Sequence, residues 1–328
     1  MRFGVIGVGG LASVRVEALL ATGTAELVAV AARRPERAAR FAAEHRGAQA
    51  QTVDELLSRA DLDAVLLALP HDVQDEVVPR AVDAGLDVLI GGPLASTLPA
   101  GRRLVDQQRR TGVVVEAGYE ARYKGVWLRS AEILRSGVLG ELVSVRANAG
   151  FDQPEGAWYS DQEASGGMLV THLSYAFLNP LRQLLGEPRI VAAIGSAKRF
   201  HDAGAVWPDT VMALAAFPGQ VVAAMTASYV KPSDFDDWNL LLVGTDGALE
   251  IHPGDLDGGH LRLSTRGTSA VVETFPSDGF SGQAAAFTRA VDARRGREPG
   301  VVPLLNPPAD AVIDLELCAE IDAMWDRG

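Results

Sequence analysis

The residues that most clearly indicate chemistry stand near the start of the chain, where glycines follow a short apolar run. The pattern G-x-G-x-x-G/A is met by Gly7-Val8-Gly9-Gly10-Leu11-Ala12. Gly7 would make a tight turn, Gly9 would let the backbone approach a pyrophosphate at a helix N-terminus, and Ala12 would allow close helix–strand packing. This spacing predicts a dinucleotide-binding loop. The alternative is a glycine turn that binds no ligand.

The residues after the second apolar run indicate which dinucleotide is bound. An NAD site usually carries Asp or Glu there, to bind the ribose hydroxyls. This chain has Ala31-Ala32-Arg33-Arg34 instead. Guanidinium groups bind a 2′-phosphate through paired, charge-assisted hydrogen bonds. We therefore expect NADP rather than NAD, unless both arginines simply lie in solvent at a helix start.

The first 117 residues supply the elements that must position this loop. Apolar runs predict five strands, at Arg2–Ile6, Glu26–Ala31, Ala64–Leu69, Asp87–Ile90 and Val113–Glu116. Helices are predicted between them, at Leu11–Ala21, Pro35–His45, Asp72–Ala84 and Thr97–Arg110, with a short helix after the capping box at Thr52. Pro79 should kink or shorten its helix. Alternating strands and helices predict an α/β fold with a doubly wound parallel sheet.

Residues 118–328 have a different pattern, which predicts an α+β domain. Helices are expected at Lys124–Ser136, Gly167–Leu185, Ser281–Arg294 and Pro308–Trp325. Eight alternating or β-branched runs predict the strands of an antiparallel or mixed sheet: Leu142–Ala149, Ile190–Ala197, Thr210–Phe217, Gln220–Val230, Trp238–Val243, Ala248–Ile251, His260–Ser264 and Ala270–Phe275. We therefore predict a dinucleotide-binding domain over 1–117 and a second domain over 118–328.

Composition excludes several classes of protein. The 328 residues include 30 Lys and Arg against 42 Asp and Glu, which gives a net charge of −12, and 48% are apolar. This apolar content argues against a disordered chain, and the acidic balance argues against a nucleic-acid binder. The single cysteine, Cys318, excludes a disulfide framework and a multi-cysteine metal site. No signal peptide or membrane-length apolar run is found, so we expect a cytoplasmic protein.

Longer motifs resemble the glucose–fructose oxidoreductase / inositol dehydrogenase family over nearly the whole chain. Besides the glycine loop, the matching segments are Leu69-Pro70-His71-Asp72, Ala84-Gly85-Leu86-Asp87-Val88-Leu89-Ile90, Pro93-Leu94-Ala95, Gly118-Tyr119-Glu120-Ala121-Arg122-Tyr123, Ser136-Gly137-Val138-Leu139-Gly140, Ser165-Gly166-Gly167, Leu184-Leu185-Gly186-Glu187-Pro188 and Gly244-Thr245-Asp246-Gly247-Ala248-Leu249. The resemblance implies a Rossmann domain and a second domain with a large open sheet that often forms oligomer interfaces. It also implies NAD(P)-linked redox chemistry at a carbon–oxygen bond of sugars or cyclitols.

Two family motifs are altered in this chain. The family usually has Glu-Lys-Pro after the fourth strand, and its Lys bridges the nicotinamide ribose and the reacting hydroxyl; here the triplet is Gly91-Gly92-Pro93. The second motif is an Asp followed four residues later by a His on one helix. Its positions are Thr171 and Tyr175 here, on one helix face. His172 is one residue out of register, and a further family His is Gln74.

Tyr175 is the best candidate to replace the missing acid or base. A phenol can protonate a developing alkoxide, but its unperturbed pKa is about 10, so it acts better as an acid in reduction. A neighbouring cation such as Lys124, Arg122 or His172 would lower that pKa. The structural alternatives are a core tyrosine, a satisfied or surface histidine, and a lysine in solvent at a helix start. Thr171, His172, Tyr175 and Lys124 are thus the catalytic candidates.

The remaining candidates concern binding. The cofactor would contact Gly7, Gly9, Gly10, Leu11, Ala12, Arg33, Arg34, Leu69, Pro70, His71, Gln74, Gly91, Gly92, Pro93 and Arg122. The substrate would contact Trp158, Tyr159, Asp236 and Trp238, from two segments that could line a cleft or merely edge a strand. We expect no metal site, no nucleic-acid or membrane partner, and a homodimer or homotetramer formed through the second domain's sheet.

Three functions compete. The first is an NADP(H)-dependent oxidoreductase for a polar, sugar-like or cyclic carbonyl, alcohol or imine, with Tyr175 as the altered acid or base. The second is a non-redox enzyme on the same fold, such as a lyase, cyclase, decarboxylase or isomerase, favoured by the loss of both the Lys and the His. The third is a catalytically silent protein that binds a ligand.

Overall fold

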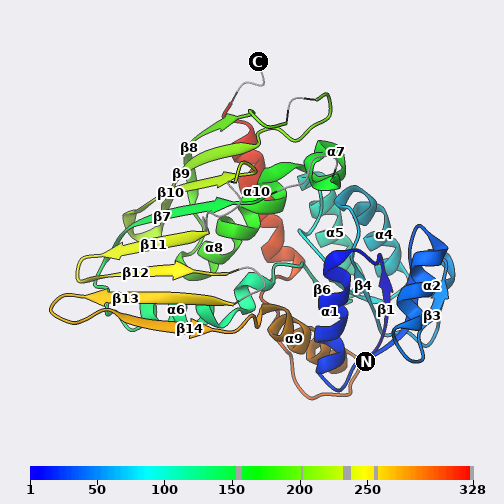
Figure 1. Ribbon diagram of the computed structural model, residues 1–328. Coiled ribbons are helices and arrows are strands. Elements are labelled where there is room, and N and C mark those ends of the chain that lie inside the picture. The colour runs from blue at the N-terminus through cyan, green and yellow to red at the C-terminus, as the bar shows by residue number, and fades with distance from the viewer. Residues whose placement is uncertain (153–156, 201, 232–237, 255–257, 326–328) are drawn as a thin grey trace. The chain divides into compact units, whose positions relative to one another are not determined.

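The computed structural model describes residues 1–152, 157–200, 202–231, 238–254 and 258–325. The chain forms two compact units, Met1–Tyr119 with Phe280–Ile313, and Glu120–Gly279 with Asp314–Gly328. The functional division predicted after residue 117 stays a prediction, and the structure adds residues 280–313 to the first compact unit. Each unit contains one sheet (Figure 1).

Sheet A of the first unit is parallel throughout, with strand order β3-β2-β1-β4-β5-β6. Its strands are β1 (Arg2–Ile6), β2 (Glu26–Ala31), β3 (Gln49–Gln51), β4 (Ala64–Leu67), β5 (Asp87–Ile90) and β6 (Val115–Glu116). The predicted doubly wound parallel sheet is confirmed. The short edge strand β3 was not predicted, because its Gln-Ala-Gln sequence carries no apolar run.

The helices of the first unit begin and end where local sequence signals lie. They are α1 (Gly10–Ala21), α2 (Pro35–Ala43), α3 (Val53–Leu57), α4 (His71–Asp83), α5 (Leu98–Thr111) and most of α9 (Gly279–Arg294). Thr52 and Glu55 form the predicted capping box of α3. Gly112, with φ +67°, ends α5. The helix α4 runs past Pro79, so the proline does not shorten it as predicted.

The core of the first unit explains why residues 280–313 belong to it. The strands β4 and β5 are buried along their whole length, as expected for a parallel sheet covered on both faces. Phe280, Phe287 and Val291 of α9 join the same core. At the end of α9, Arg294 and Arg295 form ion pairs with the buried Asp87 of β5. Burial dominates over these pairs and raises the pKa of Asp87.

Sheet B of the second unit has eight strands in the order β14-β13-β12-β11-β7-β10-β9-β8 (Figure 1). They are β7 (Leu142–Gly150), β8 (Arg189–Ser196), β9 (Thr210–Phe217), β10 (Val221–Ser228), β11 (Asn239–Gly244), β12 (Gly247–His252), β13 (Gly259–Thr265) and β14 (Val271–Phe275). Neighbouring strands are antiparallel except for β7 and β10, which are parallel. The predicted large, mostly antiparallel sheet is confirmed.

The helices of the second unit include one unexpected element. They are η1 (Glu120–Tyr123), α6 (Gly125–Arg135), η2 (Trp158–Ser160), α7 (Gln162–Ser165), η3 (Leu169–Leu178), α8 (Asn179–Leu185), η4 (Pro218–Gln220) and part of α10 (Pro308–Asp322). The prediction of one α-helix over Gly167–Leu185 is wrong in detail, because residues 169–178 form a π-helix, η3, that continues into α8. Its wider turn rotates successive side chains by less than an α-helix does.

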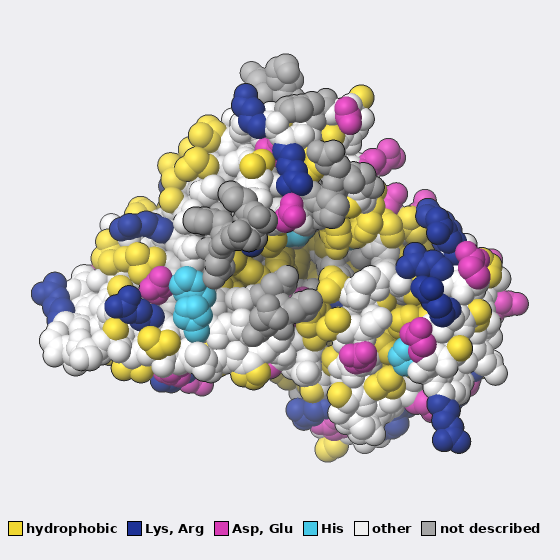
Figure 2. Space-filling view, viewed as in Figure 1, with side chains coloured by type: hydrophobic (Ala, Val, Ile, Leu, Met, Phe, Trp, Pro, Cys, Tyr) yellow, Lys and Arg dark blue, Asp and Glu magenta, His cyan; other side chains and the backbone are white. Residues whose placement is uncertain are grey.

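One face of sheet B is packed and the other exposes apolar side chains. Along β9 and β10 the buried residues alternate with exposed ones, in a two-residue period. Ile194, Met212, Leu214 and Val222 on the exposed face keep 50–66% of their surface accessible. Apolar side chains are visible along the left margin of Figure 2. Among the described residues, every helix is too short or too polar to cross a lipid bilayer.

Candidate functional site

The glycine-rich loop of the first unit has the geometry of a phosphate-binding turn. Gly7 has φ +93°, and a Cβ on it would lie 2.1 Å from the carbonyl oxygen of Ala68, so only glycine fits. Gly9 and Gly10 face open space, because a Cβ on either would have no neighbour within 4 Å. Ala12, in the first turn of α1, is fully buried. The backbone of this loop is therefore accessible to a ligand, at the N-terminus of a 12-residue helix.

The electrostatics of the loop suit an anion. The helix α1 begins at Gly10 with no side-chain cap and no acidic residue in its first turn, so its amides and dipole act on the loop without competition. Arg33 and Arg34 are exposed directly after β2. Arg37 of α2, which the sequence analysis missed, donates Nη2 to the carbonyl of Val8 at 3.2 Å. Its only sequence signal is its place in the first turn after the arginine pair.

The ends of β4 and β5 carry the other predicted cofactor residues of the first unit. Leu69 and Pro70 are half-buried and His71, which starts α4, is buried. Gln74 donates Nε2 to the carbonyl of Pro93 at 2.9 Å, and thus ties α4 to the turn after β5. Two buried oxygens of α4, Gln74 Oε1 and Asp72 Oδ1, accept no hydrogen bond from the described residues.

A buried polar network holds the turn after β5 against α1. Arg15 of α1 donates Nη2 to the carbonyl of Gly118 at 2.8 Å and Nη1 to Gln283 at 2.8 Å. The amide of Gly118 in turn donates to the carbonyl of Gly92 at 2.7 Å. Sequence reasoning missed Arg15 and Gln283, because 268 residues separate them. These hydrogen bonds connect the turn after β5 to α1, which carries the glycine-rich loop at its N-terminus.

A hydrogen-bonded chain fixes His172 in the second unit. Thr171 Oγ1 donates to the carbonyl of Gly167 at 3.0 Å, and Thr171 Oγ1 and His172 Nδ1 each lie 2.7 Å from the hydroxyl of Tyr229. Each hydroxyl of this group can donate or accept. The contacts fix the orientation of the imidazole ring, whose Nδ1 faces the hydroxyls of Thr171 and Tyr229.

The residue at the centre of this chain was not predicted. Tyr229 lies just after β10 and is fully buried. Burial raises the pKa of its phenol well above the ordinary value, and the hydrogen bond to Thr171 only partly opposes this. Tyr229 is therefore a neutral hydrogen-bonding group at all physiological pH values. No sequence pattern around it distinguishes it from the other tyrosines of the chain.

Tyr175 lies in a different environment from Thr171, although the two were predicted to share one helix face. Its hydroxyl donates to Glu120 Oε1 at 2.7 Å, and its ring lies 5.4 Å from that of Trp238. Glu120 is buried in η1, 55 residues away in sequence. His172, which is one residue out of register in the sequence motif, shares the Tyr229 hydroxyl with Thr171. Thr171 and Tyr175 thus bond to partners from different elements, Tyr229 after β10 and Glu120 in η1.

Aromatic rings connect these polar groups within the second unit. Phe151 lies 4.3 Å from His172 and 6.1 Å from Trp238, ring centre to ring centre. Lys124, expected in solvent at a helix start, is buried; its Nζ donates to Gly254 and lies 5.0 Å from the Trp238 ring. Such a cation–π contact stabilises the ammonium in a largely dry setting. We call Phe151, Tyr159, His172, Tyr175, Tyr229 and Trp238 the aromatic cluster.

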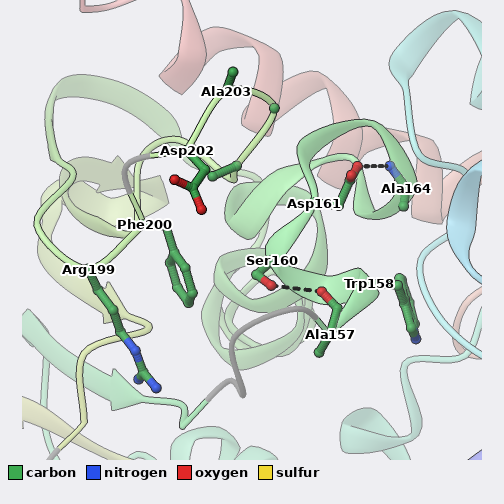
Figure 3. A pocket seen from close by; sticks show the side chains of 11 residues that line it. Ala157, Trp158, Ser160, Asp161, Ala164, Arg199, Phe200, Asp202 and Ala203 are labelled. Carbon is green, nitrogen blue, oxygen red and sulfur yellow. Dashed lines mark hydrogen bonds between the residues drawn. The ribbon is translucent and has the colours of Figure 1, made fainter.

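A pocket opens in the same unit (Figure 3). Its volume is 470 Å³, and two segments line it: Ala157, Trp158, Ser160, Asp161 and Ala164 from the first, and Arg199, Phe200, Asp202, Ala203, Gly204 and Ala205 from the second. Trp158 lines it, and its ring stacks on that of Tyr159 with the ring centres 3.7 Å apart. The rings of Tyr159 and His172 lie edge to face, with their centres 5.7 Å apart. Arg199 also lines it, while one of its nitrogens donates to the carbonyl of Tyr229 at 2.7 Å. Trp158 and Tyr159 thus connect pocket and cluster.

The other predicted residues are placed as follows. Arg122 is buried and donates Nε and Nη2 to the carbonyl of Asn179, so it is engaged within the second unit. Trp238 is buried, and its indole N–H finds no acceptor among the described residues. Asp236 lies outside the described residues. Within the described part of the chain, no group of His, Cys, Asp or Glu side chains is arranged to hold a metal ion.

Comparison with known families supplies a match for each unit. Residues 1–119 match the family described as an oxidoreductase family with an NAD-binding Rossmann fold. Residues 127–250 match the GFO/IDH/MocA C-terminal domain.

Individual relatives match over almost the whole chain. D-xylose 1-dehydrogenase (NADP(+)) 2 from Haloferax volcanii is 30% identical over 310 residues, which is 92% of this chain and 91% of that protein. The dTDP-3,4-didehydro-2,6-dideoxy-alpha-D-glucose 3-reductase from Streptomyces antibioticus is 29% identical and covers 99% and 97% of the two chains. A 3-ketoreductase from Actinomadura kijaniata, solved with NADP and TDP-benzene, has a TM-score of 0.84 and 25% identity, covering 99% and 97%.

Proposed function

The chain belongs to the GFO/IDH/MocA family of oxidoreductases, and from this we propose that it transfers hydride between NADP(H) and a carbon–oxygen bond of a sugar-like substrate. The family resemblance predicted from the sequence motifs is confirmed, and with it an NAD(P)-dependent oxidoreductase. The observation that carries the finer proposal is the glycine-rich loop at α1, open on its ligand side and flanked by three arginines.

The residues of the first unit fit the cofactor. Gly9 and Gly10 leave the space that a pyrophosphate needs, and the uncapped amides of α1 supply donors to it. Arg33 and Arg34 stand after β2, where NAD enzymes place an acid, and favour a 2′-phosphate. The H. volcanii relative is named for NADP(+), and the A. kijaniata structure contains NADP. NADP is therefore the cofactor we assign.

The substrate class is supported by the second unit. The aromatic cluster and its neighbour Trp158 offer apolar ring faces, while Tyr175, His172 and Arg199 add a few polar groups. This combination is typical of pockets that bind polar small molecules. The relatives named above act on a pentose and a deoxysugar nucleotide. We propose Trp158, Tyr159 and Trp238 as substrate contacts.

Proton transfer at the substrate oxygen is the task we assign to Tyr175 and Glu120. A bound nicotinamide would supply the hydride transfer, from an alcohol carbon in oxidation or to a carbonyl carbon in reduction. In the oxidative direction the alcohol passes its proton to the Tyr175 oxygen, as Tyr175 passes its own proton to Glu120 Oε1, 2.7 Å away. In reduction both protons move back. The buried carboxylate thus supplies the acceptor that an isolated phenol lacks.

A second copy of the chain is the partner we propose. Ile194, Met212, Leu214 and Val222 form an exposed apolar face on sheet B. In the paired register of strands, Glu250 of β12 lies opposite Arg262 of β13, so the neighbouring part of this sheet carries both charge signs. A face of this kind can pair with itself around a two-fold axis. We expect a homodimer or a homotetramer.

One observation favours a non-redox activity as the second candidate. The family resemblance implies a lysine at the position that Gly92 occupies in our alignment, and glycine has no side chain. An enzyme that binds NADP without net oxidation would form product while the absorbance of the nicotinamide stays constant.

Binding and turnover of the purified protein test the proposal. NADPH should bind with an increase in its fluorescence, and NADH should bind more weakly. When keto sugars are added with NADPH, or sugars with NADP, the absorbance of the nicotinamide should change. Product without an absorbance change would favour the second candidate. Cofactor binding without turnover on any sugar, cyclitol or nucleotide sugar would contradict the enzyme and favour a ligand-binding protein.

A further inference from the structure

Two sets of hydrogen bonds join the short helix η1 to the helical segment that η3 and α8 form in the second unit. In the first, Tyr175 donates its hydroxyl to Glu120 Oε1 at 2.7 Å. In the second, Arg122 donates Nε and Nη2 to the carbonyl oxygen of Asn179, at 2.9 and 2.7 Å. The bonded residues are two positions apart on η1 and four positions apart on the other segment. The Arg122 contact therefore lies about one helical turn from the proposed proton relay.

The position of the Glu120 carboxylate depends on what holds η1 in place. This 3₁₀ helix contains four residues, Glu120–Tyr123, and the hydrogen bonds within so short a 3₁₀ turn have poor geometry. Glu120 and Arg122 are each 4% exposed, so their side-chain hydrogen bonds lie in a nearly dry environment, where they are stronger than in water. The paired hydrogen bonds of Arg122 are therefore a strong contact on a turn that its own backbone holds weakly.

The residue that accepts from Arg122 is itself held by a buried network of the same unit. Asn179 is the first residue of α8 and is fully buried. Its Nδ2 donates to Asp314 Oδ2 at 2.7 Å, and Arg182 donates Nη1 to the other oxygen of this carboxylate at 2.8 Å. Burial raises the pKa of Asp314, while the charges of Arg182 and Arg122 act to lower it. Asp314 of α10 thus anchors Asn179, to which Arg122 fastens η1.

We infer that Arg122 is a positioning residue, which holds η1 against the start of α8 so that Glu120 stays in hydrogen-bond contact with the Tyr175 hydroxyl. The inference rests on the proposed function, in which these two side chains move the proton of the substrate. A proton passes between two oxygens only within hydrogen-bond reach, and a misplacement of about 1 Å can lower turnover about a hundredfold. The cofactor contact expected of Arg122 from the sequence is the alternative role.

Kinetics and cofactor titration of Arg122→Met test this role, with NADPH and the keto sugar that the unaltered protein reduces fastest. Methionine donates no hydrogen bond. We expect kcat to fall by about tenfold to a hundredfold, while KM and the affinity for NADPH stay nearly constant. Arg122→Lys, which keeps the charge and one donor group, should recover part of the loss. Arg129→Met is the matched control, because Arg129 of α6 bonds to Glu273 and Glu132 instead, and it should change none of these quantities.

A double-mutant cycle shows whether Arg122 acts through the relay. In a protein that already carries Tyr175→Phe, Arg122→Met should lower kcat little further, because the hydroxyl that Glu120 would contact is gone. Losses of kcat that multiply in the double variant would overturn the inference. Thermal unfolding shows whether each variant folds. If Arg122→Met does not fold, Arg122→Lys takes its place in the cycle and should lower kcat only while Tyr175 is present; an unchanged kcat would then overturn the inference.

The outcomes separate the inference from the function on which it rests. If the unaltered protein oxidises NADPH with none of the keto sugars, the proposed function is wrong and the inference falls with it. If Tyr175→Phe and Glu120→Gln lower kcat while Arg122→Met leaves it unchanged, only the inference is overturned. Weaker binding of NADPH by Arg122→Met, with kcat unchanged, would also overturn it and would favour the cofactor contact.

Discussion

Tyr175 illustrates how the chemistry of a single residue depends on a partner far away in the chain. As a lone phenol it is a weak base, and the sequence analysis preferred it as an acid. The hydrogen bond to the buried Glu120 changes this preference, because the carboxylate can receive the phenol proton. The pair can therefore serve both directions of a dehydrogenase reaction.

We expect Tyr175→Phe to lower kcat by about a hundredfold or more, which is the usual contribution of a positioned acid or base. KM should change little, since the ring that packs near Trp238 remains. Glu120→Gln keeps a hydrogen-bond acceptor but cannot take the proton, so it should lower kcat and alter the pH profile of kcat. Tyr123→Phe, the same exchange at another buried tyrosine, is the control. Steady-state kinetics measure both; unchanged kcat in both variants would contradict the relay.

Tyr229 gives a prediction about stability and pH. Burial raises the pKa of its phenol in the folded protein, whereas the unfolded chain ionises near the ordinary value of about 10. A raised folded pKa contributes stability that is complete below about pH 10 and is lost as pH rises further. The unaltered protein should lose up to about 1.4 kcal/mol more per pH unit than Tyr229→Phe in this range. Urea unfolding from pH 8 to about pH 11 measures this; parallel curves would contradict it.

At the scale of elements, the turn between β2 and α2 sets cofactor preference. Arg33, Arg34 and Arg37 are all exposed there, and Arg37 already contacts the loop through Val8. The local charge at this turn is positive although the whole chain carries −12. A charge at a binding site acts over a few ångströms, so the net charge does not decide the ligand.

Arg34→Ala should reduce the preference for NADPH over NADH by about tenfold, because a charge-assisted hydrogen bond to the 2′-phosphate is lost. NADH affinity should stay nearly constant. Arg110→Ala, an exposed arginine on α5, serves as the control and should change neither affinity. Fluorescence titration with both dinucleotides measures the ratio. An unchanged ratio in the Arg33→Ala/Arg34→Ala variant would show that these arginines do not bind the 2′-phosphate.

Most of the long elements could be predicted from local sequence, but the edge strand β3 and the π-helix η3 could not. The apolar runs and caps predicted the long strands and helices because burial and capping depend on neighbours along the chain. The π-helix at Leu169–Leu178 has no such local signal. The contacts of Thr171 and His172 with Tyr229, and of Tyr175 with Glu120, join residues 55–58 positions apart, so i, i+4 spacing could not predict them.

At the scale of the whole molecule, the exposed face of sheet B predicts assembly. Leu214→Lys puts a charge in the middle of the apolar face and should convert the proposed oligomer to monomer at micromolar concentration. Val301→Lys is the matched control, because Val301 is 93% exposed and lies in the first unit. Size-exclusion chromatography with light scattering measures both. A monomeric unaltered protein, or an oligomer that survives Leu214→Lys, would contradict the interface.

The sequence by itself determined the family, the doubly wound sheet and the glycine loop, since these depend on short patterns whose residues are neighbours in the chain. Only the tertiary structure decided that Glu120 accepts a hydrogen bond from the Tyr175 hydroxyl, that the Tyr229 hydroxyl bonds to His172, and that the His71 ring lies beside Gly92. Those contacts join residues from different elements. They follow from which strand and helix ends become adjacent, and from the volume of the side chains that meet there.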